Sequence, residues 1–487
     1  MTDSAQPDTS ATSAEPVAAS VNAQMTEPTG QPVTEPVAQA RVQPAVQTHI
    51  STTRPLGLCE RYHSIRSKIK FYSNVIVAGE YEPMPSVDDI VGALPAVLAT
   101  QPMLRSLVRA PSSTDLKDRG ELTVMDEVDV GKLVETVADS TELNLATVIR
   151  NVHDRHFDYA DRTVPPWRVL LWRSYVMMVY DHCCLDGLSG GMFHQALALA
   201  LDQPAARPEG TVARFAPTAP VLPMDAVVDM NPGVVFALKA VAKEFLPFMK
   251  PRIRKKPVGE ACVFPPLPGS YSVLTVPAAG AARLVEDARA HDTTVTAVVH
   301  TLGMVALSRA YPDNGGFASA VPVNARRYAP AYKDVMASFA VQHSGSYPVQ
   351  PEFSWDAAAA YRREMVAGLP QAPLAVGALR FLFSREEKWM LGKVGSKRDC
   401  DFELSNLGQF VIAGTRHAVR SLVFSQATGV SNPAVKLMTA AVAGGPLTVV
   451  VQIMGDVGAG ERDTMVACLE AALAELSQSA VAVVRGD

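Results

Sequence analysis

The chain has 487 residues, of which 48% are hydrophobic and 19% charged, so it can bury a sizeable core and form more than one domain. Its 44 Lys and Arg residues against 49 Asp and Glu residues give a formal net charge of -5, which argues against nucleic acid as a bulk partner. The six cysteines lack metal-ligand and disulfide-scaffold spacing. We therefore expect free thiols, no metal site and a reducing, cytoplasmic location.

Residues 1–50 are rich in Pro, Ala, Thr, Val and Gln and have almost no large apolar side chains. Such a segment buries too little surface to offset its ordering entropy, so a disordered tail is expected. The first residues lack the basic start and apolar core of a signal peptide. No run of 18 apolar residues occurs either, so no membrane span is expected.

The first half alternates strand and helix patterns. Ser86 with Asp89 resembles a capping box that opens an amphipathic helix, and Pro95 should bend that helix or split it in two. Period-2 and helical patterns predict strands and helices in the rest of this half. The predicted strands are 71–77, 104–108, 168–172 and 175–180, the last two forming a hairpin, and the predicted helices are 143–157 and 192–201.

The stretch His182-Cys183-Cys184-Leu185-Asp186-Gly187 follows the second strand of the hairpin and lies at a strand-to-helix turn. A histidine there can act as a general base, because its unperturbed pKa lies near neutrality. The alternative is a core histidine with satisfied hydrogen bonds. Asp186 can bond the imidazole or be turned away and held by an arginine, and the spacing does not decide between them. The adjacent cysteines are interpreted as packing residues.

Glycines follow this stretch. Gly187, Gly190 and Gly191 permit a tight turn and a close approach of backbone or ligand. Together with Ala196, Gly190 and Gly191 hint at room for a bulky acceptor.

Residues 203–260 are rich in proline and end in a basic cluster, Lys250 to Lys256. We interpret 226–261 as a connector between an N-terminal lobe, 51–225, and a C-terminal lobe, 262–487. The segment 234–256 could lie on an anionic membrane surface, or it could be a solvated linker with one packed helix. The second half repeats the alternation, which predicts an α/β fold of two similar lobes. Its predicted strands are 271–276, 317–323, 401–404, 421–424, 435–442 and 447–454, and its predicted helices 279–290, 293–310, 355–367 and 463–476.

Several segments, taken in the order in which they occur along the chain, resemble those of the fungal alcohol acetyltransferase family, over about residues 54–480. That family belongs to the CoA-dependent acyltransferase superfamily, with chloramphenicol acetyltransferase, plant BAHD enzymes and condensation domains. The plant Asp-Phe-Gly-Trp-Gly motif is absent, and Asp181 stands where condensation domains carry another histidine. The segments are Arg54–Gly57 with Glu60 and Tyr62-His63, Phe71–Asn74, Pro102–Arg105, Pro166–Arg168, His182–Gly187, Thr293–Thr296, Pro322–Arg326, Leu404–Gly408 and Ala443–Gly445.

The resemblance implies two chloramphenicol-acetyltransferase-like lobes with a central active-site tunnel, entered by acyl-CoA from one face and by the acceptor from the other. It implies that His182 is the general base and that Asp186 is structural and paired with Arg326. Ser405 and Asn406 would lie near the reacting carbonyl as oxyanion donors. The remaining candidate residues are Gly187 at the turn and, as substrate or loop support, Asn324, Tyr72 and Ser73.

The resulting hypothesis is a cytoplasmic, monomeric O-acyltransferase that transfers acetyl from acetyl-CoA, its co-substrate, to a small hydroxyl acceptor. No permanently bound cofactor and no covalent acyl-enzyme are required. Three alternatives stay open: an N-acyltransferase acting on an amine, a condensation-domain-like protein, and a non-catalytic acyl-binding or scaffold protein.

Overall fold

A computed structural model describes residues 51–203, 210–233, 257–259, 261–382 and 384–486. The predicted tail, 1–50, and the predicted membrane-contacting segment, 234–256, lie outside the described residues, as does most of the predicted connector. Residues Ile50–Asp487 form one compact unit.

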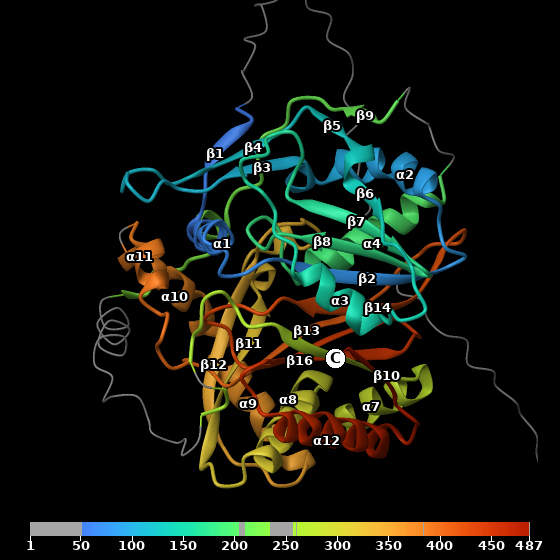
Figure 1. Cartoon of the computed structure of the whole chain (residues 1–487), viewed down its shortest axis with the longest axis vertical. Coiled ribbons are helices and arrows are strands. Elements are labelled where there is room, and N and C mark those ends of the chain that lie inside the picture. Colours follow the sequence, from blue (N-terminus) through green and yellow to red (C-terminus); the bar gives the residue numbers. More distant parts are fainter. Residues whose placement is uncertain (1–50, 204–209, 234–256, 260, 383, 487) are drawn as a thin grey trace, which may run out of the picture. The chain divides into compact units, whose positions relative to one another are not determined.

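The first half contributes four strands of a five-stranded sheet with the order β14-β2-β8-β7-β6 (Figure 1). β7 and β8 pair antiparallel in the predicted hairpin, because both carry β-branched and aromatic residues on either side of a tight turn. Helix α2 (Val87–Thr100) contacts helix α4 (Gly187–Leu201) beside this sheet. The strands are β2 (Val75–Glu82), β6 (Val134–Thr136), β7 (Trp167–Trp172), β8 (Tyr175–Tyr180) and β14 (Ala418–Gln426).

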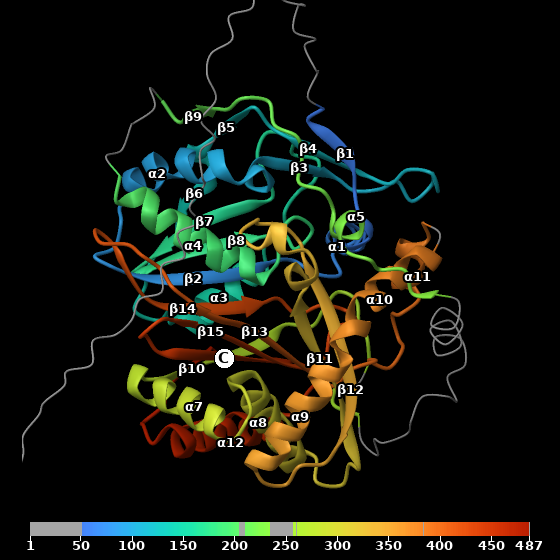
Figure 2. The same ribbon diagram turned by 180° about the vertical axis from the view of Figure 1, so that it is seen from behind.

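The second half forms a seven-stranded sheet with the order β12-β11-β13-β15-β16-β10-β17. Helices α7, α8 and α12 lie together against one face of it (Figures 1 and 2). All eight residues of β16 are buried, as expected for a strand covered on both faces. The strands are β10 (Gly269–Val276), β11 (Gly316–Asn324), β12 (Ala340–Pro348), β13 (Phe402–Phe410), β15 (Val435–Val442), β16 (Leu447–Met454) and β17 (Ala482–Gly486).

The second half contributes one strand to the sheet of the first half. β14 comes from the second half of the sequence, yet it pairs antiparallel with β2 and completes the first sheet. The predicted lobe boundaries assign residues 418–426 to the C-terminal lobe by sequence position alone. Since β14 also contacts β15, it connects the two sheets.

The helices follow the predicted patterns with shifted ends. Two small sheets, β1-β4-β3 and β5-β9, complete the described strands: β1 (Thr53–Pro55), β3 (Ser106–Arg109), β4 (Glu121–Val124), β5 (Glu127–Asp129) and β9 (Val212–Arg214). The described helices are α1 (Leu58–Lys68), α2 (Val87–Thr100), α3 (Leu145–His153), α4 (Gly187–Leu201), α5 (Met224–Val227), α7 (Ala278–Ala290), α8 (Val295–Ala310), α9 (Trp355–Gly368), α10 (Ala372–Gly377), α11 (Glu386–Leu391) and α12 (Ala459–Ser477).

The predicted capping box is present at the start of α2, where Ser86 and Asp89 bond reciprocally. Of the two outcomes predicted for Pro95, a bend or a split, the split does not occur, because α2 runs unbroken from Val87 to Thr100. Burial of its apolar face, including Leu94 and Leu98, holds the helix together across the lost backbone hydrogen bond.

Two further boundaries differ from the sequence prediction. β2 begins at Val75 instead of Phe71, because the preceding residues form an irregular segment in which Tyr72 bridges to Gly429. α4 begins at Gly187 instead of Met192, since Asp186 caps it through the backbone N–H of Ser189. As a result, Phe71–Asn74 lie just before β2, and the stretch from His182 to Asp186 lies between the end of β8 and the start of α4.

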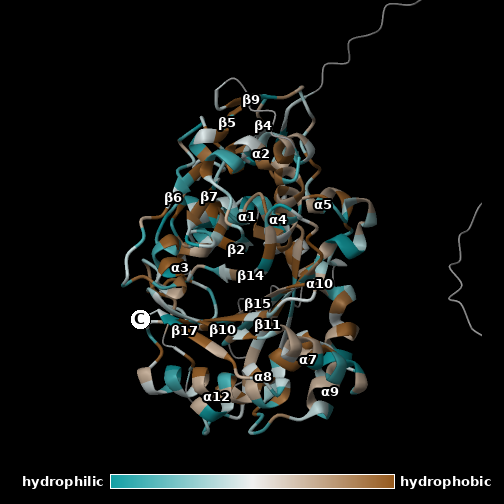
Figure 3. Ribbon diagram, turned by 90° about the vertical axis from the view of Figure 1, so that its right-hand side faces the viewer, coloured by the Kyte–Doolittle hydropathy of each residue, from teal (hydrophilic) through white to brown (hydrophobic). Residues whose placement is uncertain are grey.

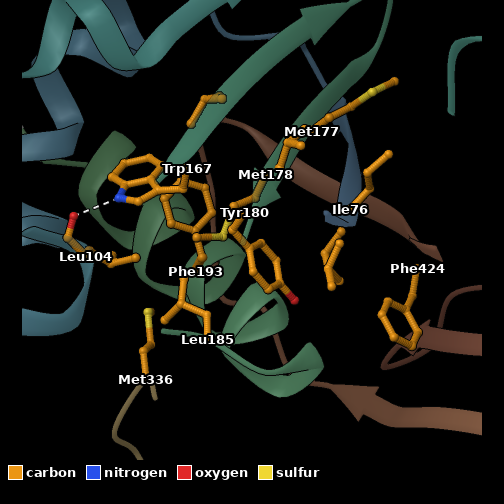
Figure 4. Packing of buried hydrophobic residues seen from close by; sticks show 14 of the residues in the cluster. Ile76, Leu104, Trp167, Met177, Met178, Tyr180, Leu185, Phe193, Met336 and Phe424 are labelled. Atoms are coloured by element: carbon orange, nitrogen blue, oxygen red, sulfur yellow. Dashed lines mark hydrogen bonds between the residues drawn. The ribbon is translucent and has the colours of Figure 1, made fainter. Parts of the chain in front are cut away.

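The largest core cluster surrounds the β7–β8 hairpin. Trp167, Tyr180 and Phe193 pack inside it, and the Trp167 Nε1–H donates to the Leu104 carbonyl at 2.7 Å (Figure 4). Several strands carry runs of hydrophobic residues, while outer helices such as α2 and α12 mix hydrophobic and hydrophilic ones (Figure 3). All six cysteines are free, and the adjacent Cys183 and Cys184 are buried.

One described helical stretch, Trp355–Leu382, is long and apolar enough to cross a membrane by length and composition only, and 17% of its most apolar window is buried. It is not one regular helix. A 3-10 turn at Leu369–Gln371 separates α9 from α10. α9 packs on α8, and α10 packs on β12.

Candidate active site

The predicted strand-to-helix turn holds His182 between β8 and α4. Asp181 fixes the start of the turn, because its Oδ1 accepts from the Cys183 N–H at 2.8 Å. Tyr180 fixes its end by donating its hydroxyl to the Asp186 carbonyl at 2.9 Å. These two hydrogen bonds hold both ends of the turn, and neither of them involves the His182 side chain.

Asp186 does not contact the imidazole by a hydrogen bond. Its carboxylate accepts from Arg326 Nη1 at 2.6 Å and Nη2 at 3.3 Å, from the Phe339 N–H at 3.0 Å and from Ser189. Asp186 and Arg326 are 4% and 2% exposed. Burial alone would raise the pKa of Asp186, but Arg326 and the Ser189 donors outweigh it and hold that pKa below its usual value.

The open choice for Asp186 is thus decided in favour of the arginine. Arg326 follows β11 and also donates to the Val335 and Ala337 carbonyls, so it ties α4 of the first half to the second half. Asn324 supports it, because its Oδ1 accepts from the Arg326 N–H at 3.0 Å. A buried ion pair of this kind holds both side chains in place. The Asp186 carboxylate is already paired with Arg326 and is therefore not available to exchange a proton.

The His182 side chain is half-buried. Its Nδ1 is buried and has no hydrogen-bond partner among the described residues. Nε2 is not buried in this way and bonds no described residue, so it is the nitrogen left for a substrate. Burial lowers the pKa of His182, while its own backbone carbonyl and Asp186 oppose the lowering. The ring is therefore neutral at physiological pH.

Two aromatic residues lie close to this ring. The His63 imidazole stacks on it with 4.2 Å between centroids and 2° between planes. The Tyr72 ring lies 6.4 Å from it at 57°. The Tyr72 hydroxyl is buried without a described partner, and the cations of Arg66 and Lys436 lie 4.7 and 5.6 Å from the Tyr72 ring centroid.

Ser73 was predicted to support either the substrate or a loop, and it lies against the end of α3. Its hydroxyl donates to the His153 carbonyl at 2.5 Å, and the neighbouring Asn74 donates to the Val152 carbonyl at 2.9 Å. Both residues anchor the end of α3 and do not face the imidazole. The prediction of loop support suits Ser73, whereas substrate contact does not.

The Ser405-Asn406 segment lies on β13 beside the turn. A side chain at Gly187 would collide with the Leu407 side chain, so β13 packs directly on the start of α4. Asn406 is already engaged, because its Nδ2 donates to Thr296 at 2.8 Å and its Oδ1 accepts from Gly408 at 2.7 Å. The Ser405 hydroxyl bonds no described residue.

The small residues of α4 do not make room for an acceptor. A side chain at Gly190 would overlap Val77, and one at Gly191 would overlap the ring of Phe410. The hint that these glycines leave space for a bulky acceptor is therefore wrong. Their role is to let β2 and β13 approach the helix closely.

A cavity of about 530 Å³ lies next to the Asp186–Arg326 pair. It is bounded by β11, the start of α8 and the end of α9, and Asn406 and Arg326 reach its wall. His182 is not part of its lining. A second cavity of about 260 Å³ lies in the first half, beside Pro165 and Pro166. In the described part of the chain, no three His, Cys, Asp or Glu side chains gather to hold a metal ion.

Sequence reasoning missed His63, Arg66 and Lys436. The Tyr62-His63 pair was noted only as part of a family-like segment. One local signal was available: residues 63 and 66 are three apart and share a helix face. Nothing in the sequence connects that face to residue 182.

Comparison with known proteins adds three findings. The alcohol acetyltransferase family model matches residues 131–473. An uncharacterized protein of Schizosaccharomyces pombe is 23% identical over 427 residues, covering 83% of this chain and 92% of its own length. Among solved structures, the trichothecene 15-O-acetyltransferase from Fusarium sporotrichioides is similar, with a TM-score of 0.64 and 11% identity, over 87% of this chain and 94% of that one.

The condensation domain of the Monacolin K polyketide synthase is also similar, with a TM-score of 0.56 and 13% identity, over 88% of this chain and 97% of that one. At these identities the structural likenesses show the fold alone. The two-lobed α/β fold expected from the sequence is confirmed.

Proposed function

Since the chain belongs to the alcohol acetyltransferase family and is an acyltransferase, we propose that it transfers an acetyl group from acetyl-CoA to a hydroxyl acceptor. The observation that carries the proposal is the state of His182. It is a half-buried, neutral imidazole with Nε2 free, while the nearby Asp186 is fully engaged by Arg326. That arrangement suits a general base which works without a charge relay.

The reaction needs one base and no covalent intermediate. His182 Nε2 accepts the proton of the acceptor hydroxyl as its oxygen attacks the thioester carbonyl carbon, and a C–O bond forms. The carbonyl oxygen becomes an oxyanion. When the oxyanion collapses, the C–S bond breaks and the leaving sulfur takes the proton from His182. The products are the ester and free CoA.

Ser405 is the better of the two predicted oxyanion donors. Its hydroxyl bonds no described residue, whereas the Asn406 amide is already bonded on both sides. The contact of Leu407 with Gly187 keeps this strand next to the turn that carries His182. A preorganised donor that needs no other bond broken is the more effective one.

The 530 Å³ cavity is the proposed site for part of the CoA chain. Val321, Met365 and Leu369 give it an apolar wall suited to the pantetheine arm. Arg327 and Lys333, both exposed, lie at its edge and suit the phosphate groups. Arg326 lines this cavity and also holds Asp186, which lies four residues after His182 in the sequence.

The test uses the purified full-length chain with acetyl-CoA and panels of alcohols and amines, with detection of the released CoA thiol and mass spectrometry of the product. His182→Ala should lower the turnover rate by roughly 10² to 10⁴, the usual contribution of a general base. His291→Ala is the control, since His291 is exposed and stacks on Trp355 with 4.3 Å between ring centroids.

Undiminished CoA release by His182→Ala would refute the base. If products form only from amines, the proposed acceptor is an amine and not a hydroxyl.

A further inference from the structure

Helix α1 carries His63 to the face of His182, and this contact joins residues far apart in the sequence. The two imidazoles are stacked almost parallel, at 2° and with 4.2 Å between centroids. Both rings are half-buried, and the Nδ1 atom of each is buried without a partner among the described residues. The stacking therefore restrains the plane of the His182 ring.

Histidine bases are usually oriented by a carboxylate or carbonyl that bonds the second ring nitrogen. The nearest carboxylate candidates do not serve here. Asp186 is engaged by Arg326, Ser189 and the Phe339 N–H, and the Oδ1 of Asp181 accepts from Cys183. Beside the imidazole's own backbone carbonyl, a flat ring at stacking distance is positioned to orient His182.

The helix that carries His63 is anchored on both sides of that residue. Arg61 forms a buried ion pair with Glu386, and Arg66 Nη2 donates to Asn432 Oδ1 at 2.6 Å. The start of α1 is held by the Leu58 N–H, which donates to Asp225 Oδ1 at 2.9 Å. Three contacts to later parts of the chain therefore fix the position of the His63 ring.

From this geometry we propose that His63 is a positioning residue for the base. Its ring covers one face of the His182 imidazole, holds its plane, and presents a neutral aromatic face to the imidazolium that forms when the base takes a proton. This inference rests on the proposed function of His182 as that base. No proton passes through His63.

The surroundings favour a neutral His63. Burial lowers its pKa well below the usual value, and His182 and Arg66 lower it further. The charged or titratable groups around the stacked pair are Arg66 on α1, Asp181 and Asp186 at the turn, and Tyr72, with Lys436 over the Tyr72 ring. A neutral aromatic ring attracts a cation at its face, whereas a second imidazolium would repel it.

Two variants separate positioning from proton transfer. His63→Ala removes the ring, and His63→Phe keeps a flat ring but removes both nitrogens. We expect His63→Ala to lower kcat about 10- to 100-fold, the scale of a misplaced catalytic group, with little change in KM for acetyl-CoA. His63→Phe should restore kcat to near that of the unmodified enzyme, with the same acid limb in its pH profile. His291→Ala, which breaks a similar stack on the surface, should leave kcat unchanged.

A second measurement does not depend on turnover. Diethylpyrocarbonate acylates neutral, accessible histidines, and mass spectrometry of the peptide containing residue 182 reports its rate. We expect faster modification of His182 in His63→Ala and an unchanged rate in His63→Phe.

The outcomes are distinguishable. If His63→Phe is as slow as His63→Ala and its acid limb moves, His63 transfers protons and the positioning role is overturned. Unchanged kcat and unchanged modification in His63→Ala overturn it as well. If His182→Ala keeps full activity, the proposed function fails, whereas the modification rates still decide whether His63 covers that ring.

Discussion

Asp186→Asn removes one negative charge from an enclosed ion pair while keeping the size of the side chain. The Arg326 guanidinium, 2% exposed, would lose its counter-ion and keep only carbonyl and hydroxyl partners. The Phe339 N–H could still donate a hydrogen bond to the amide oxygen of the introduced asparagine. Breaking a buried ion pair from one side costs about 3–5 kcal/mol, because an uncompensated charge stays buried.

The expected loss converts into a melting shift. At roughly 2.1 cal/mol/K per residue over the roughly 440 residues of Ile50–Asp487, the unfolding entropy is about 0.9 kcal/mol/K. A loss of about 3–5 kcal/mol then lowers Tm by about 3–5 °C. The matched control is Glu127→Gln. Its partner Arg214 is 73% exposed and Glu127 59% exposed, so at most about 1 kcal/mol, or about 1 °C, is expected.

The assay is thermal unfolding followed by circular dichroism, with kcat measured on the same samples. A pH series checks the sign. The folded-state pKa of Asp186 is depressed, so its stabilisation is present above about pH 4 and is lost as the pH falls through the folded pKa. The variant should lack this acid-dependent loss. An unchanged Tm together with a large loss of kcat would give Asp186 a chemical role and refute the structural one.

Three further predictions concern stability and the oxyanion. Burial lowers the pKa of His194 to about 4 and that of His300 to about 3, so both stay neutral at pH 5 in the folded state but are protonated in the unfolded chain. Each should therefore cost about 2 kcal/mol of stability between pH 7 and pH 5, and equal denaturant midpoints at the two pH values would contradict this. Gly191→Val should destabilise by about 1–3 kcal/mol through overlap with Phe410, and adding Phe410→Ala should recover part of the loss in denaturant melts. Ser405→Ala should lower kcat by about 10² while Asn406→Ala has a smaller effect, and the reverse order in single-variant kinetics would move the oxyanion role to the amide.

Much of the local structure was predictable because its causes are local. The alternating residues of 167–180 specify a hairpin, and Ser86 with Asp89 specifies a helix start. The position of His182 was predictable for the same reason, since a strand pattern, a glycine-containing turn and a helix pattern follow one another there and place residue 182 in the turn. Even the role of Asp186 was partly determined, because a helix cap at that position already binds the Ser189 N–H.

What the sequence could not provide depends on contacts between distant residues. The residue pattern predicts a strand at 421–424, within β14, but does not say that it pairs with β2 in the other half. Glycines in α4 predict close approach without saying whether a ligand or the Val77 and Phe410 side chains fill the space.

The environment of the base was decided by tertiary structure alone. His63 and His182 are 119 residues apart, and no propensity or spacing rule relates them. They meet because ion pairs and hydrogen bonds fix α1 against later parts of the chain. The sequence therefore identified His182 as the candidate base. Packing determined which ring covers it and which arginine holds the neighbouring carboxylate, since those contacts form only when the whole core closes.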